Sequence, residues 1–132
     1  MARTFPLTIV TPDGKKIQDD AVILNVRTTS GQLGILAGHL PLVAVVEISK
    51  MNYKKEDGSS IDLAVAGGIL SVTKTEVIVL AEAFETKDEI DEQRALESKL
   101  RAENRINSND PNVDMKRAEL SLQRALIRLS LK

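Results

Sequence analysis

Basic side chains at helical spacing are the residues of this sequence whose chemistry is easiest to define. Four residues near the C-terminus repeat at the spacing of one helix face: Arg117, Ser121, Arg124 and Arg128. Arg124 and Arg128 repel each other by roughly a few tenths of a kcal/mol, and no acid follows within the helix to offset them. Arg94, in a preceding helical segment, is expected to lie near them in an antiparallel hairpin. Converging guanidinium groups bind phosphate oxygens bidentately, which favours a polyanion ligand. Salt bridges to Glu85 or Asp91 are the competing interpretation.

Other residues that could do chemistry give weaker patterns. His39 is the only histidine, and we interpret it as a hydrogen-bonded structural residue because no Ser/Asp arrangement accompanies it. The stretch Gly31–Gly38 lacks the Gly-Lys-Ser/Thr ending of a phosphate loop, so we interpret it as a turn-rich loop. Asp19 and Asp20 are adjacent acids without further metal ligands nearby. No catalytic or metal site is predicted, and the absence of cysteine excludes thiolate nucleophiles and cysteine-based metal sites.

The composition limits the classes of function. The 132 residues predict one domain, or a small domain with an appendage. The 18 Lys and Arg nearly balance the 19 Asp and Glu, which excludes general adhesion to nucleic acid or anionic lipid. The longest apolar run, Leu40–Val46, is too short to cross a bilayer, and no apolar signal core follows Met1. We therefore expect a soluble, intracellular protein with an aliphatic core.

The first part of the chain has the pattern of short strands and turns. All seven glycines lie between Gly14 and Gly68, and three of the four prolines fall in the same half. Turn chemistry at Pro12–Gly14, at Asp57–Ser59 and at Gly67-Gly68 separates segments rich in Val and Ile. The expected strands are 7–10, 21–28, 34–36, 42–48, 61–66, 69–73 and 77–81. Many short strands predict an all-β sandwich or barrel.

From Phe84 onward the pattern changes to helices. Thr86 and Glu89 have the spacing of a capping box, which predicts a helix from there to about Asn104. Residues 105–110 indicate a turn, and Asp110-Pro111 predicts the start of a second helix that runs to about Leu129. The expected fold is a mainly β head, a sandwich of two sheets in residues 1–84, followed by an antiparallel two-helix hairpin in residues 85–132.

Each predicted helix carries two apolar faces. One stripe on each helix forms an expected seam: Ala95, Ser98 and Ala102 on the first, and Met115, Ala118, Leu122, Ala125 and Leu129 on the second. A second set of apolar residues points elsewhere: Leu96 and Leu100 on the first helix, and Leu120, Ile127 and Leu131 on the second. The second faces either rest on the β head or also serve another protein when the hairpin moves.

Four stretches make the chain resemble the epsilon subunit of bacterial rotary (F-type) ATP synthases over essentially its whole length. These stretches are Leu7–Gly14, Ser30–Leu42, Ala66–Leu70 and Lys116–Ala125. The resemblance implies a β-sandwich head, a two-helix hairpin, and a non-catalytic role in the central stalk that couples the rotor and restrains ATP hydrolysis. It implies binding to the gamma subunit, to the membrane ring of c subunits and, through an extended hairpin, to an acidic surface of the catalytic beta subunit. It also implies a peripheral place on the cytoplasmic face of the bacterial membrane.

Resemblance also implies two sets of site residues. Some relatives bind ATP as a regulatory ligand in the compact hairpin through an Ile/Leu-Asp-x-x-Arg-Ala motif, which residues 90–95 match. Carried over to this chain, the ATP-binding residues are Glu85, Ile90, Asp91, Arg94, Ala95, Arg124 and Arg128. The residues expected to face the c ring are Ser30, Gly31, Gly34, Gly38, His39 and Pro41. No metal or required cofactor is implied.

Three alternatives stay open beside this interpretation. The chain could be a free-standing nucleotide sensor, which would keep the arginine cluster and need no other subunit. It could be a rotor scaffold whose helices bind no nucleotide. It could also be a small hydrolase or transferase that uses the loop from Gly31 to His39, which turnover of a nucleotide would reveal.

Overall fold

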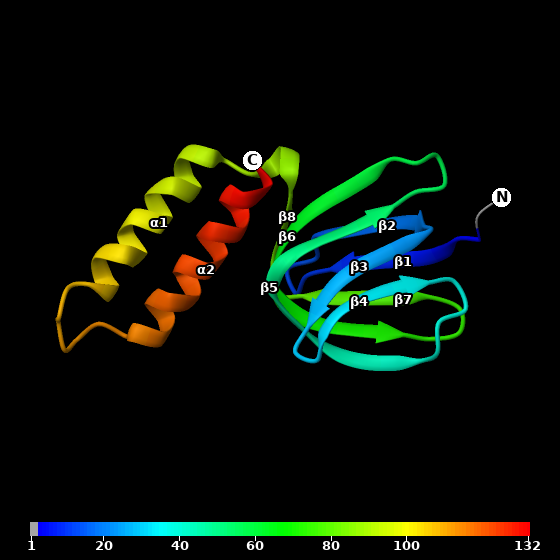
Figure 1. Cartoon of the computed structure of the whole chain (residues 1–132), viewed down its shortest axis with the longest axis horizontal. Coiled ribbons are helices and arrows are strands. Elements are labelled where there is room, and N and C mark those ends of the chain that lie inside the picture. Colours follow the sequence, from blue (N-terminus) through cyan, green and yellow to red (C-terminus); the bar gives the residue numbers. More distant parts are fainter. Residues whose placement is uncertain (1–2) are drawn as a thin grey trace.

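The computed structural model describes residues 3–132 and divides into a β head and a helical hairpin (Figure 1). The strands of the head are β1 Phe5–Val10, β2 Lys16–Ala21, β3 Ile23–Thr28, β4 Gly31–Leu36, β5 Leu42–Lys54, β6 Ser60–Val72, β7 Val77–Ala81 and β8 Phe84–Thr86. A short 3-10 turn, η1 Lys87–Glu89, precedes the helices α1 Glu92–Ile106 and α2 Met115–Leu131. The predicted sandwich followed by a two-helix hairpin is confirmed.

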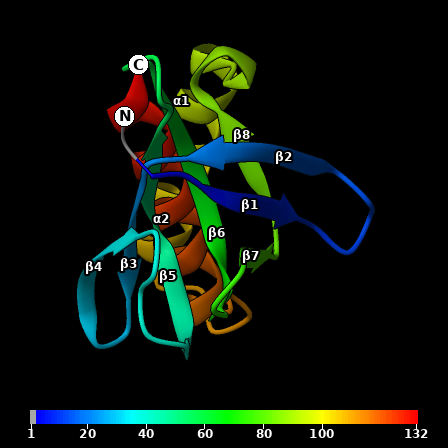
Figure 2. The same cartoon turned by 90° about the vertical axis from the view of Figure 1, so that its right-hand side faces the viewer.

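The strands of the head form one hydrogen-bonded sheet that folds over itself. Their order is β2-β1-β7-β6-β5-β3-β4, with β8 pairing with the first half of β6. All pairs are antiparallel except β1 with β7. Figure 2 shows β3, β4 and β5 on one side of the head and β1, β2 and β7 on the other. The 13-residue strands β5 and β6 are long enough to take part in both layers, so the two layers of the sandwich are continuous.

Alternating side chains of the strands form the core. In β1, Phe5, Leu7 and Ile9 are buried while the residues between them are not, which is the period of a strand with one face inward. Aliphatic residues and three aromatic rings fill the space between the layers: Leu24, Val26, Ile35, Met51, Leu63, Leu70 and Val79, with Phe5, Tyr53 and Phe84. The Tyr53 hydroxyl donates to Asp19 at 3.0 Å, which gives this buried ring a polar partner.

Two expectations about the glycines are wrong. Gly67 and Gly68 do not break a strand, because β6 runs through both of them. A Cβ atom at Gly68 would clash with the Leu80 carbonyl oxygen on β7, so close strand approach explains this glycine. The stretch from Gly31 is not a turn-rich loop either, because β4 begins at Gly31 and pairs with β3 along its whole length.

Both helices begin later than predicted. Glu89 does accept hydrogen bonds from the backbone and hydroxyl of Thr86, but this contact closes only η1. Ile90 then takes an extended backbone conformation, and Asp91 caps α1 by accepting the Arg94 N–H at 3.1 Å. In α2 the cap is Asp114.

Asp110 and Pro111 form a separate turn before that cap. The Asp110 carboxylate accepts the Asn112 N–H at 2.9 Å, and its carbonyl oxygen accepts the Val113 N–H at 3.1 Å. The backbone hydrogen bonds of this segment are therefore used locally. The second helix consequently begins at Met115 rather than at Pro111.

The hairpin rests on the head through its second helix. Helix α2 lies between α1 and the head, and it packs against β5 and β6 (Figure 1). The buried residues of the helices are all alanines, Ala95 and Ala102 on α1 and Ala118 and Ala125 on α2, which confirms the small-residue seam. Met115 departs from it and is exposed. Leu96 and Leu100 on α1 are also exposed, so the second apolar face of this helix is not covered by the head.

Candidate functional site

A groove between the two helices opens beside the head and gathers most of the predicted anion-binding residues. Its inner section is an open cavity of about 310 Å³. The side chains that line it are Glu85, Glu89, Asp91, Arg94, Ala95, Ser98, Arg101 and Arg128. They come from β8, the linker and both helices, so the section exists only while the hairpin lies against the head.

Each of the three acids of this section forms an ion pair or a hydrogen bond within the protein. Glu85 Oε1 lies 2.7 Å from Arg128 Nε and links β8 to α2. Asp91 caps α1, as described above. Glu89 accepts hydrogen bonds from Lys15 and Thr86, and these contacts lower its pKa to about 2. Among residues 3–132, Arg128 is therefore the one arginine of the groove that pairs with a carboxylate.

A second section continues the groove along the helices. It is lined by Ser98, Arg101, Arg105, Ser121, Arg124 and Arg128, with no acid among them. Within residues 3–132, Arg94, Arg101, Arg105 and Arg124 form no ion pair. Unpaired guanidinium groups that converge on one open groove favour binding of a polyanion over interhelical salt bridges.

The structure places the seven predicted ATP-binding residues close together. Five line the inner section, and Arg124 lines the second section with Arg128, which both sections share. Ile90 does not line the groove but is buried beside Asp91, where it fixes the linker between η1 and α1.

Two arginines of the groove were missed by the reasoning from sequence. Arg101 and Arg105 follow Arg94 at intervals of seven and four residues, which places all three on one helix face. This spacing was available in the sequence. Arg101 is further held in place because it donates to the Ser98 hydroxyl at 3.1 Å.

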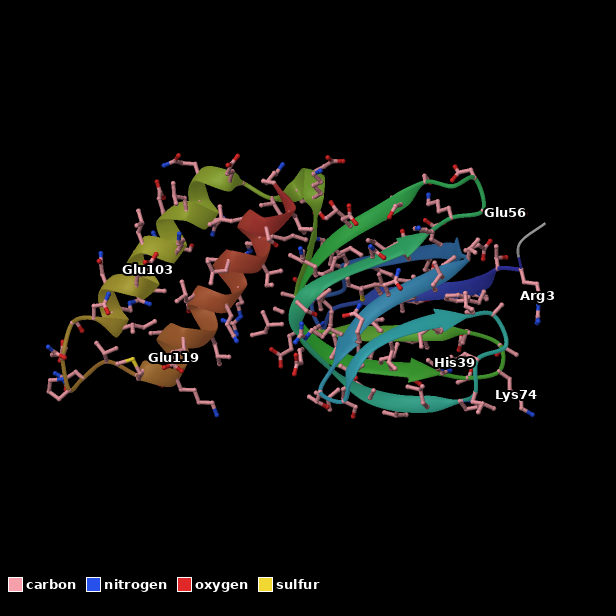
Figure 3. The ribbon with its side chains drawn as sticks, viewed as in Figure 1. Arg3, His39, Glu56, Lys74, Glu103 and Glu119 are labelled. Atoms are coloured by element: carbon pink, nitrogen blue, oxygen red, sulfur yellow. The ribbon has the colours of Figure 1, made fainter. Side chains whose placement is uncertain are left out.

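The residues predicted to face the c ring do not form one surface. Ser30 and Gly31 lie at the turn between β3 and β4, whereas Gly38, His39 and Pro41 follow the opposite end of β4. The six residues of β4 separate these ends by roughly 20 Å, and Gly34 lies between them. Figure 3 shows His39 at the end of the head away from the hairpin, together with Arg3, Glu56 and Lys74.

The remaining candidates for chemistry have structural contacts. The His39 ring nitrogen Nδ1 lies 2.8 Å from its neighbour's carbonyl oxygen, at Leu40. Asp19 contacts Tyr53 and Lys55. Within the described range, 3–132, no cluster of three or more His, Cys, Asp or Glu could hold a metal ion, and no helix is long and apolar enough to span a membrane.

Comparison with known proteins agrees with this architecture for both the β head and the helical hairpin. The family model described as the ATP synthase delta/epsilon chain, beta-sandwich domain, matches residues 4–87, and the long alpha-helix domain of the same chain matches residues 88–132. The chain belongs to the ATP synthase delta/epsilon chain family. The resemblance to the epsilon subunit is confirmed, because relatives named "ATP synthase epsilon chain" match nearly end to end.

Two bacterial relatives and one solved structure illustrate the similarity. The epsilon chain of Bacillus licheniformis is 46% identical over 129 residues, covering 98% of each chain. That of Halalkalibacterium halodurans is 45% identical over 130 residues, covering 97% of this chain and 96% of the relative. A chain of the Euglena gracilis mitochondrial ATP synthase superposes with a TM-score of 0.83 at 23% identity, over 96% of this chain and 79% of that one, and supports the fold.

Family membership gives the function its broad form: an epsilon subunit of an F-type ATP synthase. The family models and the relatives named epsilon chain match along nearly the whole chain, including the stretch 31–39. Family membership does not by itself assign a ligand to the arginine groove.

Proposed function

We propose that this epsilon chain is a non-catalytic regulator whose compact hairpin binds ATP. The observation that carries the proposal is the groove beside Asp91, Ala95 and Glu85, in which Arg94, Arg101, Arg105 and Arg124 form no ion pair within residues 3–132 and Arg128 pairs with Glu85. Arg94, Arg124 and Arg128 hold the phosphates, while the acids and the flanking backbone shape the nucleoside pocket.

In this proposal, ATP binding and docking of the hairpin on the head depend on each other. The inner section takes Glu85 from the head, Arg94 from α1 and Arg128 from α2, so opening the hairpin removes it. ATP that binds only the compact state stabilises that state by RT ln(1 + [ATP]/Kd). When ATP falls, the extended state gains population, and the freed basic face of α2 contacts an acidic surface of the catalytic beta subunit.

Calorimetric titration of the whole chain with ATP and with ADP tests the ligand. We expect saturable binding that prefers ATP and is lost in the Arg94→Ala variant. Lys87→Ala is the matched control, because it removes an exposed base near the same linker that does not line the arginine groove. Absence of ATP binding by the parent would refute the ligand and leave the rotor-scaffold interpretation.

A distance measurement tests the movement. Since the chain contains no cysteine, fluorophores can be attached to introduced cysteines at Ser59 in the head and Asn109 at the hairpin turn. We expect added ATP to raise the fraction of molecules that have the compact distance. An unchanged distribution at saturating ATP would contradict coupling between binding and docking.

The head is proposed to join the central stalk through both of its separated surfaces. Leu40 and Val43, at the end that carries His39, are 79% and 75% exposed, which supports contact with an apolar protein surface. The turn at Ser30 and Gly31 presents a polar surface about one strand length away. We assign the two ends to different partners, the gamma subunit and the c ring, at the cytoplasmic face of the membrane.

Crosslinking separates these partners. Ser30→Cys and Leu40→Cys, each in the assembled enzyme, are expected to crosslink to different subunits. Crosslinking of both positions to the same subunit would contradict the assignment. Co-purification of the chain with the gamma subunit also excludes the free-standing nucleotide sensor.

A further inference from the structure

The arginine groove extends well beyond the residues assigned to ATP. The second section shares Ser98, Arg101 and Arg128 with the inner one. A third section, at the hairpin turn, shares Arg105 with the second and adds Arg117 from α2. The three sections therefore follow one another from the head to the far end of the hairpin, the end nearest Glu103 and Glu119 in Figure 3.

Its arginines follow one another in three tiers. From Arg94 to Arg101 is seven residues and from Arg101 to Arg105 is four, or roughly 10 Å and 6 Å along the helix axis. Arg128, Arg124 and Arg117 descend the antiparallel helix in the same order. The phosphorus atoms of a triphosphate are joined through single bridging oxygens. Such a chain starting at Arg94 reaches the second tier, and it ends before Arg105 and Arg117.

The acids are distributed unevenly along the same line. Glu85, Glu89 and Asp91 all lie in the inner section, and the second section has no acid. In the third, the only acid is Asp114, which caps α2. Neither Arg105 nor Arg117 forms an ion pair within the part of the chain that is described, residues 3–132. The outer groove thus carries positive charge that the ATP site does not use.

We propose that the groove binds linear phosphate chains longer than a triphosphate, with Arg105 and Arg117 contacting the phosphates beyond the third. This inference rests on the proposed function for the inner section, where the nucleoside would lie. Two sources share the required chemistry: a nucleoside tetraphosphate, which uses the whole groove, and inorganic polyphosphate, which uses its arginines alone.

Calorimetry on the full chain with four probes tests the proposal: ATP, adenosine 5′-tetraphosphate, inorganic tripolyphosphate and a long inorganic polyphosphate. We expect the tetraphosphate to bind about tenfold more tightly than ATP, the effect of one added charge-assisted hydrogen bond. The readout is the ratio of the two dissociation constants, since a general loosening of the hairpin changes both. In Arg105→Gln/Arg117→Gln this ratio should fall to about one.

The control variant carries the same change of charge outside the groove. Lys99 and Lys116 lie on the same helices and do not line any of the three sections. Lys99→Gln/Lys116→Gln should keep the parent ratio. The proposal would be overturned if the ratio of dissociation constants fell equally in both double variants, or if it were already near one in the parent.

The inorganic probes distinguish a nucleotide ligand from a free phosphate chain. They also distinguish failure of this inference from failure of the proposed function. Saturable binding of long polyphosphate that depends on Arg105 and Arg117 identifies a free phosphate chain as a ligand, even if ATP fails to bind. Binding of the tetraphosphate alone identifies a nucleotide. ATP binding without any gain from a fourth phosphate would leave the proposed function standing and refute this inference, whereas no binding of any probe would refute both.

Discussion

The ammonium group of Lys15, in the turn between β1 and β2, lies 2.9 Å from the carboxylate of Glu89 at the end of η1. The same nitrogen donates to the Phe84 carbonyl oxygen at 2.8 Å and lies over the Phe84 ring. These contacts join β8 and η1 to the turn between β1 and β2. Movement of the hairpin away from the head is therefore expected to begin after Glu89, in the extended backbone at Ile90 and Asp91, and it requires the buried Ile90 side chain to leave its site.

Replacement of Lys15 tests this attachment. Lys15→Met removes the ion pair and the hydrogen bond and keeps much of the side-chain volume, so we expect the free energy of unfolding to fall by about 1 kcal/mol. Urea unfolding followed by circular dichroism measures it. Lys16→Met is the matched control, since Lys16 is exposed and makes no ion pair within residues 3–132. Equal effects of the two changes would show that the Lys15 contacts contribute no stability.

Stability in acid should depend on Glu89. Its pKa in the folded chain is lowered to about 2 from 4.5, mainly by the hydrogen bond from Lys15. A lowered pKa contributes stability that is fully present above the unfolded value and is lost as the pH falls from there toward the folded value. We expect the urea midpoint of the parent to drop between about pH 4.5 and pH 2 by more than that of Glu89→Gln. The carboxylate is partly exposed, so added salt should reduce the difference.

Local patterns predicted the elements of the fold better than their ends. Val- and Ile-rich segments and turn residues were sufficient to predict the β head, because side-chain alternation is a local property. Strand β2, with Gln18, Asp19 and Asp20, was missed because it is polar and owes its form to pairing with β1. The helix starts were misplaced because Thr86 and Asp110 have suitable capping side chains, yet Asp91 and Asp114 make the caps.

Gly68 shows why a glycine pair was mistaken for a strand break. Only the position of β7 reveals that the Leu80 carbonyl oxygen occupies the place of a Cβ atom. We expect Gly68→Ala to cost more than about 2 kcal/mol, since backbone atoms on two strands must shift. Gly58→Ala is the control: it also has a positive φ, of 88°, but nothing lies within 4 Å of its added Cβ, so only the local strain of about 1 kcal/mol applies. Thermal unfolding of the two variants should separate clash from backbone strain.

The sequence was sufficient to predict which arginines gather at the candidate site, but not which acid pairs with which arginine. Helical spacing was enough to bring Arg94, Arg124 and Arg128 together, and the same rule would have added Arg101. Which acid neutralises which base depends on how β8, η1 and α2 meet. The sequence left Glu85 and Asp91 as equal competitors, whereas the structure assigns Glu85 to Arg128 and Asp91 to the helix cap. The sequence also did not show that β4 separates Ser30 and Gly31 from His39 and Pro41, although these residues are close in sequence.

The small alanines between the two helices should set the width of the groove without affecting the stability of the head. Ala125 is fully buried. Ile127 faces β6, and Ala125 lies two residues before it, which is about 200° around the helix. Ala125 therefore faces α1. We expect Ala125→Leu to push the helices apart at a cost of about 1–3 kcal/mol, because the seam has no room for the added atoms. Hydrogen exchange should then show faster exchange of α1 amides with unchanged protection of β1 and β7, and ATP affinity should fall with it. Glu119→Leu, at an exposed position on the same helix, should change neither the exchange of α1 amides nor the affinity for ATP. A variant at Ala125 that kept α1 protected and bound ATP like the parent would mean that helix spacing does not set the width of the groove.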